Sequence, residues 1–163
     1  MFPCERVGLH FIETAPFRFS NSVDLTITPG QLWQVLEEPE SWPRWSFVKK
    51  MTWTNPERLG VGSTRTIELR HGTAIDEVIA WKPHSHMAFR IIQDSDSSQR
   101  ASVEELRIEP TPTGCRLTWT LAHDPKNPSL LAKILAKRAM KWQYTEYLDK
   151  LRQYTDQRFG VTI

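Results

Sequence analysis

Hydrophobic and polar residues alternate through most of the middle of the chain, the period-two pattern of half-buried β-strands. Short segments rich in Gly, Pro, Asn and Asp separate the alternating stretches. Because these connections are too short for parallel crossovers, successive strands are expected to pair as antiparallel hairpins. The predicted strands are residues 17–27, 47–54, 63–70, 73–81, 87–92, 102–108 and 115–121. The pattern therefore predicts a seven-stranded antiparallel sheet.

Helical spacing of apolar residues occurs after the first strand and again at the end of the chain. Thr28 can cap a helix and Pro29 suits its first turn, so a short helix is predicted over 29–38. A single helical turn follows, in which Trp42 and Trp45 share one side. This turn is either a gate over a pocket mouth or an apolar plug that packs the short helices onto the sheet. A long helix is predicted over 129–155.

The order of these elements predicts an α+β fold. A sheet of this size has one apolar face, and only the long helix can cover it. We therefore expect a curved antiparallel sheet wrapped around the C-terminal helix, with an apolar pocket between them for a hydrophobic small molecule. Residues 17–157 are expected to form this domain, residues 1–16 a flexible or edge-pairing arm, and residues 158–163 a C-terminal tail.

Four segments resemble the START/Bet v1-like (SRPBCC) superfamily, in its polyketide cyclase/dehydrase branch. They are VDLTITPGQLWQVLEEPESWPRW, GVGSTRTIEL, EVIAWKP and GCRLTWTL, and the resemblance covers residues 19–155. It implies the helix-grip fold, a seven-stranded sheet curled round a C-terminal helix with a cavity between them. The superfamily includes lipid carriers, hormone receptors, stress proteins, cyclases and aromatases, so the fold alone does not assign an activity.

Composition narrows the class of protein further. A chain of 163 residues is typical of one domain, and a formal net charge of +2 argues against a nucleic-acid-binding protein. Two cysteines are too few for a disulfide framework, and no apolar run approaches the ~20 residues of a membrane span. His84 and His86 have no evident third partner for a metal, so no metal or cofactor is expected. We expect a cytoplasmic monomer or weak homodimer without an integral membrane segment.

The loop between the predicted strands 63–70 and 73–81 determines which side chains of these two strands face the pocket. A three-residue loop, 70–72, would place Ile67 opposite Ile75 and Arg65 opposite Glu77, with the apolar positions on one face. This register predicts an Arg65–Glu77 pair on the concave face. The pair is then either a polar anchor for a ligand's carbonyl or hydroxyl, or a hydrated structural pair at the cavity rim.

Glu104 is a second acidic residue whose orientation matters. Alternation points Glu104 inward beside Trp119, where burial would raise the pKa of its carboxyl and suit it to act as a general acid. A bulge at Glu104 and Glu105 would reverse this. The arrangement we favour from the sequence places Glu105 outward and Glu104 at a strand end.

The long helix carries two apolar stripes on largely different sides. One consists of Leu130, Leu131, Ile134, Leu135, Ala139 and Trp142, and the other of Met140, Tyr144, Tyr147, Leu148, Leu151 and Tyr154. Three arrangements fit. The first is a kink or rotation of the helix near Met140. In the second, the tyrosine-rich half contacts the sheet while the first half forms a lid over the pocket. In the third, part of one stripe is exposed and contacts a dimer partner or a membrane. The row of Lys133, Lys137 and Lys141 is interpreted as a solvated face.

These observations favour binding of a lipid, polyketide or aromatic compound by a carrier or sensor. The alternatives are a polyketide cyclase, aromatase or dehydratase, and a protein-interaction module. If the protein is an enzyme, the candidate catalytic residues are Arg65, Glu77 and Tyr144. The predicted ligand-binding residues are Trp33, Trp45, Arg65, Ile67, Leu69, Glu77, Ile79, Trp81, Phe89, Ile91, Leu117, Trp119, Leu135, Ala139 and Trp142.

Overall fold

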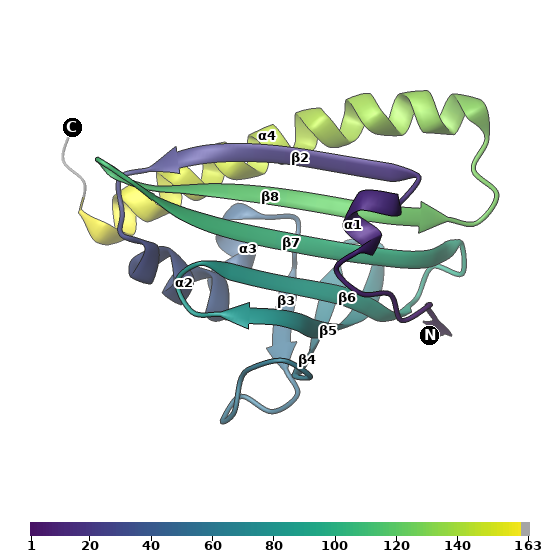
Figure 1. The fold of residues 1–163 in the computed structure, drawn as a ribbon, viewed down its shortest axis with the longest axis horizontal. Helices are drawn as coiled ribbons and strands as arrows, with labels where there is room; N and C mark the ends of the chain where they lie inside the picture. Colours follow the sequence, from purple (N-terminus) through teal and green to yellow (C-terminus); the bar gives the residue numbers. More distant parts are fainter. Residues whose placement is uncertain (161–163) are drawn as a thin grey trace.

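A computed structural model describes residues 1–160 and shows an open, curved sheet with a long helix along one side (Figure 1). The elements are β1 (Phe2–Pro3), α1 (Phe11–Thr14), β2 (Phe17–Leu25), α2 (Pro29–Glu37), α3 (Trp42–Trp45), β3 (Lys50–Trp53), β4 (Thr64–Leu69), β5 (Gly72–Lys82), β6 (His86–Asp94), β7 (Gln99–Thr111), β8 (Gly114–Pro125) and α4 (Leu130–Phe159). The predicted tail begins inside α4, and its residues 161–163 lie outside the described part of the chain.

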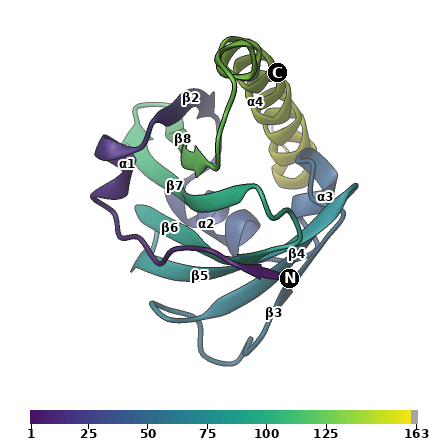
Figure 2. The same cartoon turned by 90° about the vertical axis from the view of Figure 1, so that its right-hand side faces the viewer.

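The sheet has the order β2-β8-β7-β6-β5-β4-β3, and every neighbouring pair is antiparallel. Because β2 pairs with β8, the first long strand is joined to the last one rather than to the next strand in sequence. The sheet curls, and α4 lies along its open side (Figure 2). This is the helix-grip fold, and the predicted antiparallel sheet, early short helices and long C-terminal helix are confirmed.

Local sequence signals account for the helix boundaries. The Thr28 hydroxyl accepts a hydrogen bond from the backbone N–H of Gln31, whose side chain accepts one from the Thr28 N–H, which completes a capping box at α2. At the start of α4, the Ser129 side chain accepts a hydrogen bond from the N–H of Ala132. The helix ends at Gly160, whose φ of 68° is a left-handed conformation that glycine adopts without strain.

The Trp42–Trp45 turn is an apolar plug in the core. Trp42 and Trp45 are 2% and 1% exposed, and the Trp45 ring lies 5.6 Å from the ring of Trp119 on the sheet. The Trp42 indole N–H donates to the backbone carbonyl of Leu36 at the end of α2, which fixes the turn against the preceding helix. Of the two roles considered for this turn, the structure supports the plug.

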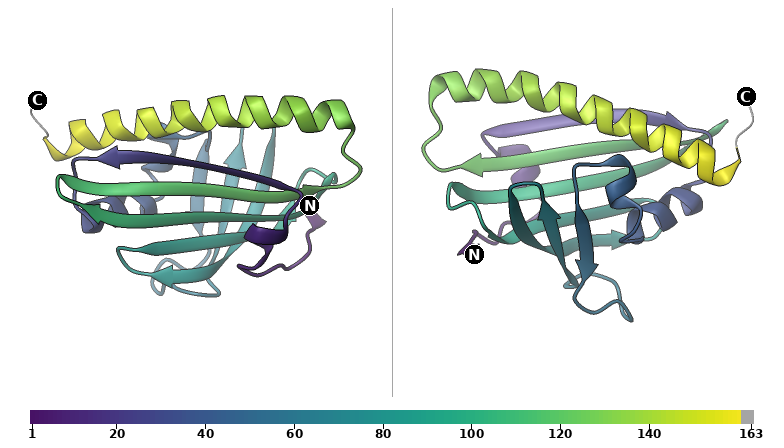
Figure 3. Two further views of the ribbon diagram at one scale, coloured as in Figure 1. Left: turned by 45° about the horizontal axis from the view of Figure 1, so that its top comes forward. Right: turned by 180° about the vertical axis from the view of Figure 1, so that it is seen from behind.

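The N-terminal arm covers part of the sheet's outer face (Figure 3). Ile12 of α1 is buried against Val103 and Ala122 of β7 and β8, in an apolar cluster separate from the main core. Phe2 and Pro3 pair with the end of β6, beyond its last pairing with β7. The expectation that only one face of the sheet is apolar was therefore wrong. Residues 1–16 lack a periodic pattern, so this cover could not be predicted from the sequence.

The two halves of α4 have different surroundings. Its second half is packed through Tyr144, Leu148, Leu151 and Thr155, all buried. Its first half leaves five large apolar side chains exposed: Leu130, Leu131, Ile134, Leu135 and Trp142. The helix is continuous, so the two stripes differ by exposure along one helix. Within residues 1–160, no helix combines the length and apolar character needed to cross a bilayer.

Candidate functional site

A cavity of about 310 Å³ lies between the inner face of the sheet, α3 and the middle of α4. Its wall is mostly apolar, and its polar side chains come from the four strands β5 to β8 and from α4. The lining residues are Trp42, Phe47, Val48, Ile67, Leu69, Ala74, Asp76, Phe89, Ile91, Asp94, Gln99, Ser102, Glu104, Leu121, His123, Met140 and Tyr144. Met140 and Tyr144 are the contribution of α4, so the helix forms one side of this cavity.

The hairpin of β4 and β5 differs from the predicted register. Leu69 pairs with Gly72, so the loop has two residues, and Arg65 stands opposite Asp76 rather than Glu77. This shift by one residue turns Asp76 inward and Glu77 outward. The apolar pattern misled the prediction because Ile79 is packed on the outer face, beneath the N-terminal arm. A register shift between Val78 and Ala80 then returns Trp81 to the inner core.

Arg65 is the centre of a buried charged cluster beside the cavity. Its side chain is fully buried, and its Nε donates to both carboxylate oxygens of Asp76 at 2.9 and 3.1 Å. Its guanidinium carbon lies 3.5 Å from the centroid of the Phe89 ring and 4.9 Å from that of Trp42. Such stacking suits the planar guanidinium, which is less strongly hydrated than an ammonium group. Burial raises the pKa of Asp76, and Arg65 opposes that effect.

Glu104 faces the same cavity from β7. Glu104 pairs with Leu121 of β8, and the β7–β8 register is regular at this point, so the bulge that would have turned it outward is not present there. Its Oε1 accepts a long hydrogen bond of 3.5 Å from Nη2 of Arg65. Burial raises the pKa of Glu104 to about 7, helped by the nearby charge of Asp76 and opposed by Arg65. The favoured strand-end placement of Glu104 was wrong, and the inward alternative is what the structure shows.

Several polar atoms near the cavity lack a protein partner. Among the described residues, Gln99 Oε1 and His123 Nε2 on the cavity wall are buried and make no hydrogen bond, and neither does Nη1 of Arg65. Burial lowers the pKa of His123, so the neutral imidazole is favoured. Burial and the adjacent Glu104 raise the pKa of Tyr144 well above its ordinary value, which keeps the phenol protonated. The polar part of the wall therefore offers both donors and acceptors.

Glu77 does not belong to this site. Its carboxylate accepts a hydrogen bond from Arg90 at 3.0 Å and pairs with Arg6 of the N-terminal arm, on the outer face. Glu77 therefore cannot anchor a ligand in the cavity, and its proposed roles in binding and catalysis were wrong.

The structure separates the predicted ligand-binding residues into three groups. Ile67, Leu69, Phe89 and Ile91 line the cavity, and Arg65 lies behind its wall. A second group is packed in the main core: Trp33, Trp45, Trp81, Leu117 and Trp119. A third group lies elsewhere, with Ile79 under the arm and Leu135, Ala139 and Trp142 exposed on α4. Sequence reasoning missed Asp76, Gln99, Ser102 and His123, which depend on register and on the curl of the sheet.

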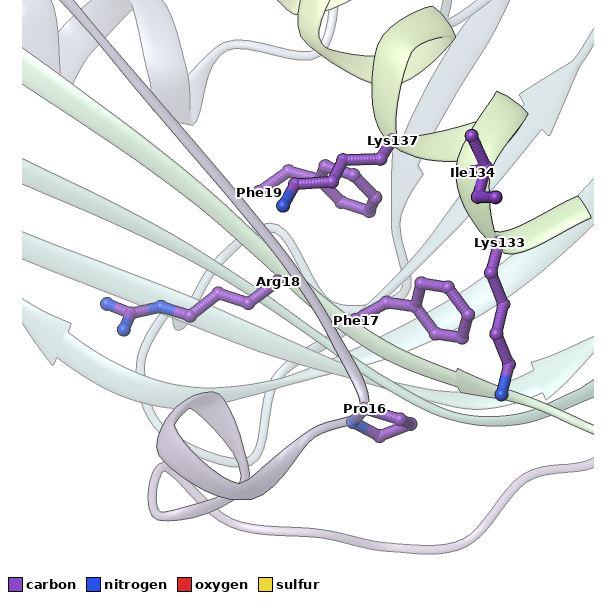
Figure 4. A pocket seen from close by; sticks show the side chains of 7 residues that line it. All are labelled: Pro16, Phe17, Arg18, Phe19, Lys133, Ile134 and Lys137. Atoms are coloured by element: carbon purple, nitrogen blue, oxygen red, sulfur yellow. The ribbon is translucent and has the colours of Figure 1, made fainter. Parts of the chain in front are cut away.

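A groove between β2 and the first half of α4 lies beside this cavity. Phe17 and Phe19 of β2 form its apolar floor (Figure 4). The opposite side is formed by α4, through Lys133, Ile134 and Lys137, and the Arg18 side chain points away from the groove. The rings of Phe17 and Phe19 lie 5.1 and 5.9 Å from that of His123, which lines the cavity.

No group of three or more His, Cys, Asp or Glu side chains within residues 1–160 is arranged to hold a metal ion.

Comparison with known proteins agrees with this architecture. The family described as "Polyketide cyclase / dehydrase and lipid transport" matches residues 16–156. The chain belongs to this family. An uncharacterized protein of Mycobacterium tuberculosis (strain ATCC 25618 / H37Rv) is 47% identical over 163 residues, which cover 99% of this chain and 98% of the relative. The counterpart from Mycobacterium bovis has the same identity and coverage.

Solved structures show the same family fold at low sequence identity. A START superfamily protein from Mycobacterium smegmatis has a TM-score of 0.72 at 13% identity, covering 86% of this chain and 97% of that chain. The di-domain ARO/CYC StfQ from the steffimycin biosynthetic pathway has a TM-score of 0.73 at 14% identity. The match covers 92% of this chain and 54% of the StfQ chain. At these identities the likeness shows the fold alone.

Proposed function

We propose that this protein binds an amphipathic small molecule in the cavity between the sheet and α4, as a carrier or sensor. The observation that carries the proposal is a largely apolar cavity whose wall also has polar side chains, two of which, Gln99 and His123, have a buried atom without a protein partner. Such a wall suits a ligand with an extended apolar body and a hydroxyl or carbonyl group. A lipid, a polyketide and an aromatic compound all have this chemistry.

The unpartnered polar atoms support an amphipathic ligand over a pure hydrocarbon. A buried polar atom without a hydrogen bond costs free energy, of order 1–3 kcal/mol. A ligand hydroxyl can donate to Gln99 Oε1, and a hydroxyl or carbonyl can accept from the Glu104 carboxyl when that group is protonated. A hydrocarbon of the same shape would satisfy none of these atoms.

The first test is native mass spectrometry of the freshly purified protein, followed by organic extraction of bound compounds. Titration with the fluorescent probe N-phenyl-1-naphthylamine then tests the cavity directly. Ala74→Phe adds a ring to the cavity wall and should abolish probe binding, because Ala74 faces the cavity. Thr73→Phe, on the adjacent outward-facing position, is the matched control. Equal binding by both variants would refute the assignment of this cavity.

A second candidate function is cyclisation or dehydration of a polyketide-like substrate. Glu104 favours it, because a carboxyl whose pKa is raised to about 7 can donate and accept a proton near neutral pH. Nη2 of Arg65 donates to Glu104 from behind the wall, and the charge of Glu104 helps to raise the pKa of Tyr144 on α4. The Tyr144 phenol, which lines the cavity, could therefore hold a carbonyl oxygen near Glu104 during enolisation. An aldol closure followed by dehydration releases one water, so the extracted product would be lighter than the substrate by one water.

The variant Glu104→Gln separates the two functions. It keeps the size of the side chain and removes its titration, so a carrier should retain its ligand and probe binding. An enzyme should bind the same compound but return it without the loss of water. A bound compound that leaves the wild-type protein with unchanged mass supports the carrier.

A further inference from the structure

The first half of α4 exposes an unusual amount of apolar surface. Five large side chains on residues 130–142 are 54–74% exposed. At ~100° per residue they fall within one arc of the helix, and we call them the apolar stripe: Leu130, Leu131, Ile134, Leu135 and Trp142. Arg138 and Lys141 fall within the same arc, so the face combines exposed apolar side chains with positive charge. Large apolar side chains exposed together commonly mark a site of contact with a protein or a membrane.

The charge around the apolar stripe has one sign. Residues 126–145 contain five basic residues and no acidic one: Lys126, Lys133, Lys137, Arg138 and Lys141. The whole chain carries only +2, so the rest of the protein is net acidic. The positive charge is therefore concentrated on the same part of α4 that exposes apolar side chains.

We propose that the apolar stripe docks on an anionic lipid bilayer. A helix with an apolar arc and flanking Lys and Arg side chains lies in the membrane interface, with its cations at the level of the lipid phosphates. Trp142 marks one end of the stripe, and its amphipathic ring suits the interface. Long basic side chains can reach the phosphates while their methylenes stay on apolar surface.

The same charges argue against a second copy of this chain as the partner. Arg138 lies between Ile134 and Trp142 in an i, i+4, i+8 row, so it is part of the face that would contact a partner. A symmetric contact through this face would bring like charges together and bury them without counter-ions. Lipid phosphates supply those counter-ions.

Docking in this orientation places the groove beside the membrane. Lys133 and Lys137 stand on the groove side of α4, above Phe17 and Phe19 (Figure 4). These two rings contact His123, which lines the cavity. The groove thus joins the docked helix to the cavity, although docking itself does not depend on the proposed ligand.

Flotation with lipid vesicles tests the proposal. The full-length protein should float with phosphatidylcholine vesicles that contain phosphatidylglycerol, remain unbound with phosphatidylcholine alone, and dissociate as salt rises. Lys137→Gln/Lys141→Gln should weaken the partition roughly 10- to 30-fold, since each lysine near an anionic surface contributes about fivefold. The control Lys49→Gln/Lys82→Gln removes the same charge from exposed sites elsewhere and should bind like wild type.

The apolar contribution is tested separately. Leu131→Glu/Leu135→Glu should abolish flotation, while Val61→Glu, at a 70% exposed site in the β3–β4 loop, should leave it unchanged. Trp142 is 69% exposed, so its emission should shift to the blue on docking, and Trp142→Phe should remove that shift. Binding of the cavity probe should be unaffected by these surface substitutions, so the two proposals can fail independently.

Three results would overturn the docking proposal. The first is equal or absent binding of wild type to neutral and anionic vesicles. The second is equal binding by the stripe variants and their controls. The third is a dimer in light scattering that Leu131→Glu/Leu135→Glu dissolves, which would assign the apolar stripe to a second copy.

Discussion

The buried pair of Arg65 and Asp76 gives a sharp prediction about stability. The substitution Asp76→Asn keeps the shape of the side chain but removes the charge that faces a fully buried guanidinium. Breaking a buried ion pair by removing one partner costs about 3–5 kcal/mol, because the remaining charge is left uncompensated. Glu104 reaches Arg65 at 3.5 Å and can partly replace Asp76 as counter-ion, so the lower end, about 3 kcal/mol, is expected.

The matched control is the next residue on the same strand. Glu77 pairs with Arg90 and Arg6 on the outer face, where the side chains of Arg90 and Arg6 are 21% and 60% exposed, so both cations keep contact with water when Glu77 is neutralised. Glu77→Gln should therefore cost less than about 1 kcal/mol. The two variants differ in position by one residue and in expected cost by roughly a factor of three or more.

Chemical denaturation followed by tryptophan fluorescence measures both free energies of unfolding. A cost of about 3 kcal/mol corresponds to a fall in Tm of roughly 6–12 °C for a domain of this size. The reasoning would be refuted if Asp76→Asn lost less than about 1 kcal/mol, or if Glu77→Gln lost as much as Asp76→Asn. The second result would restore the register in which Arg65 faces Glu77.

Two further predictions concern Glu104 and Gly114. Burial raises the folded-state pKa of Glu104 from 4.5 to about 7, so its stabilising contribution is present below pH 4.5 and is lost as pH rises through 7. Denaturation across this range should show a loss on the order of 3 kcal/mol in wild type that Glu104→Gln lacks; parallel curves would exclude the shift. Gly114 has φ +156°, and an added Cβ would lie 2.0 Å from the Leu25 carbonyl oxygen. Gly114→Ala should cost several times more stability than Gly60→Ala, whose added Cβ meets nothing within 4 Å, and similar midpoints for both would contradict this close approach.

Local patterns were sufficient for the elements from β2 onward, but not for β1 and α1 in the N-terminal arm. Strand alternation depends on residues two apart, and the Thr28 cap and Ser129 cap depend on residues within one helical turn, so each signal lies within a short window of sequence. Short connections then left antiparallel pairing as the only geometry for the middle strands. The order of the elements indicated that the long helix returns to cover the sheet, and the resemblance of four segments to one family agreed with that arrangement.

The candidate site depended on tertiary structure. A one-residue difference in the 70–72 loop exchanged Asp76 for Glu77, because every side chain of a strand changes face when its register shifts by one. The apolar outer-face position Ile79 made the wrong register look consistent, and the N-terminal arm that buries it has no periodic signal. The inward position of Glu104 likewise required the observed pairing of β7 with β8.

The sequence by itself determined the class of protein: a single curved antiparallel sheet, two short early helices and a long helix at the end. It also identified Arg65 as an inward-facing cation, because its strand alternates clearly. Only the tertiary structure decided that Asp76 and Glu104 meet this cation, that most tryptophans fill the core, and that half of α4 is exposed. These outcomes depend on contacts between residues distant in the chain, and local periodicity contains no information on which of two apolar faces will be covered.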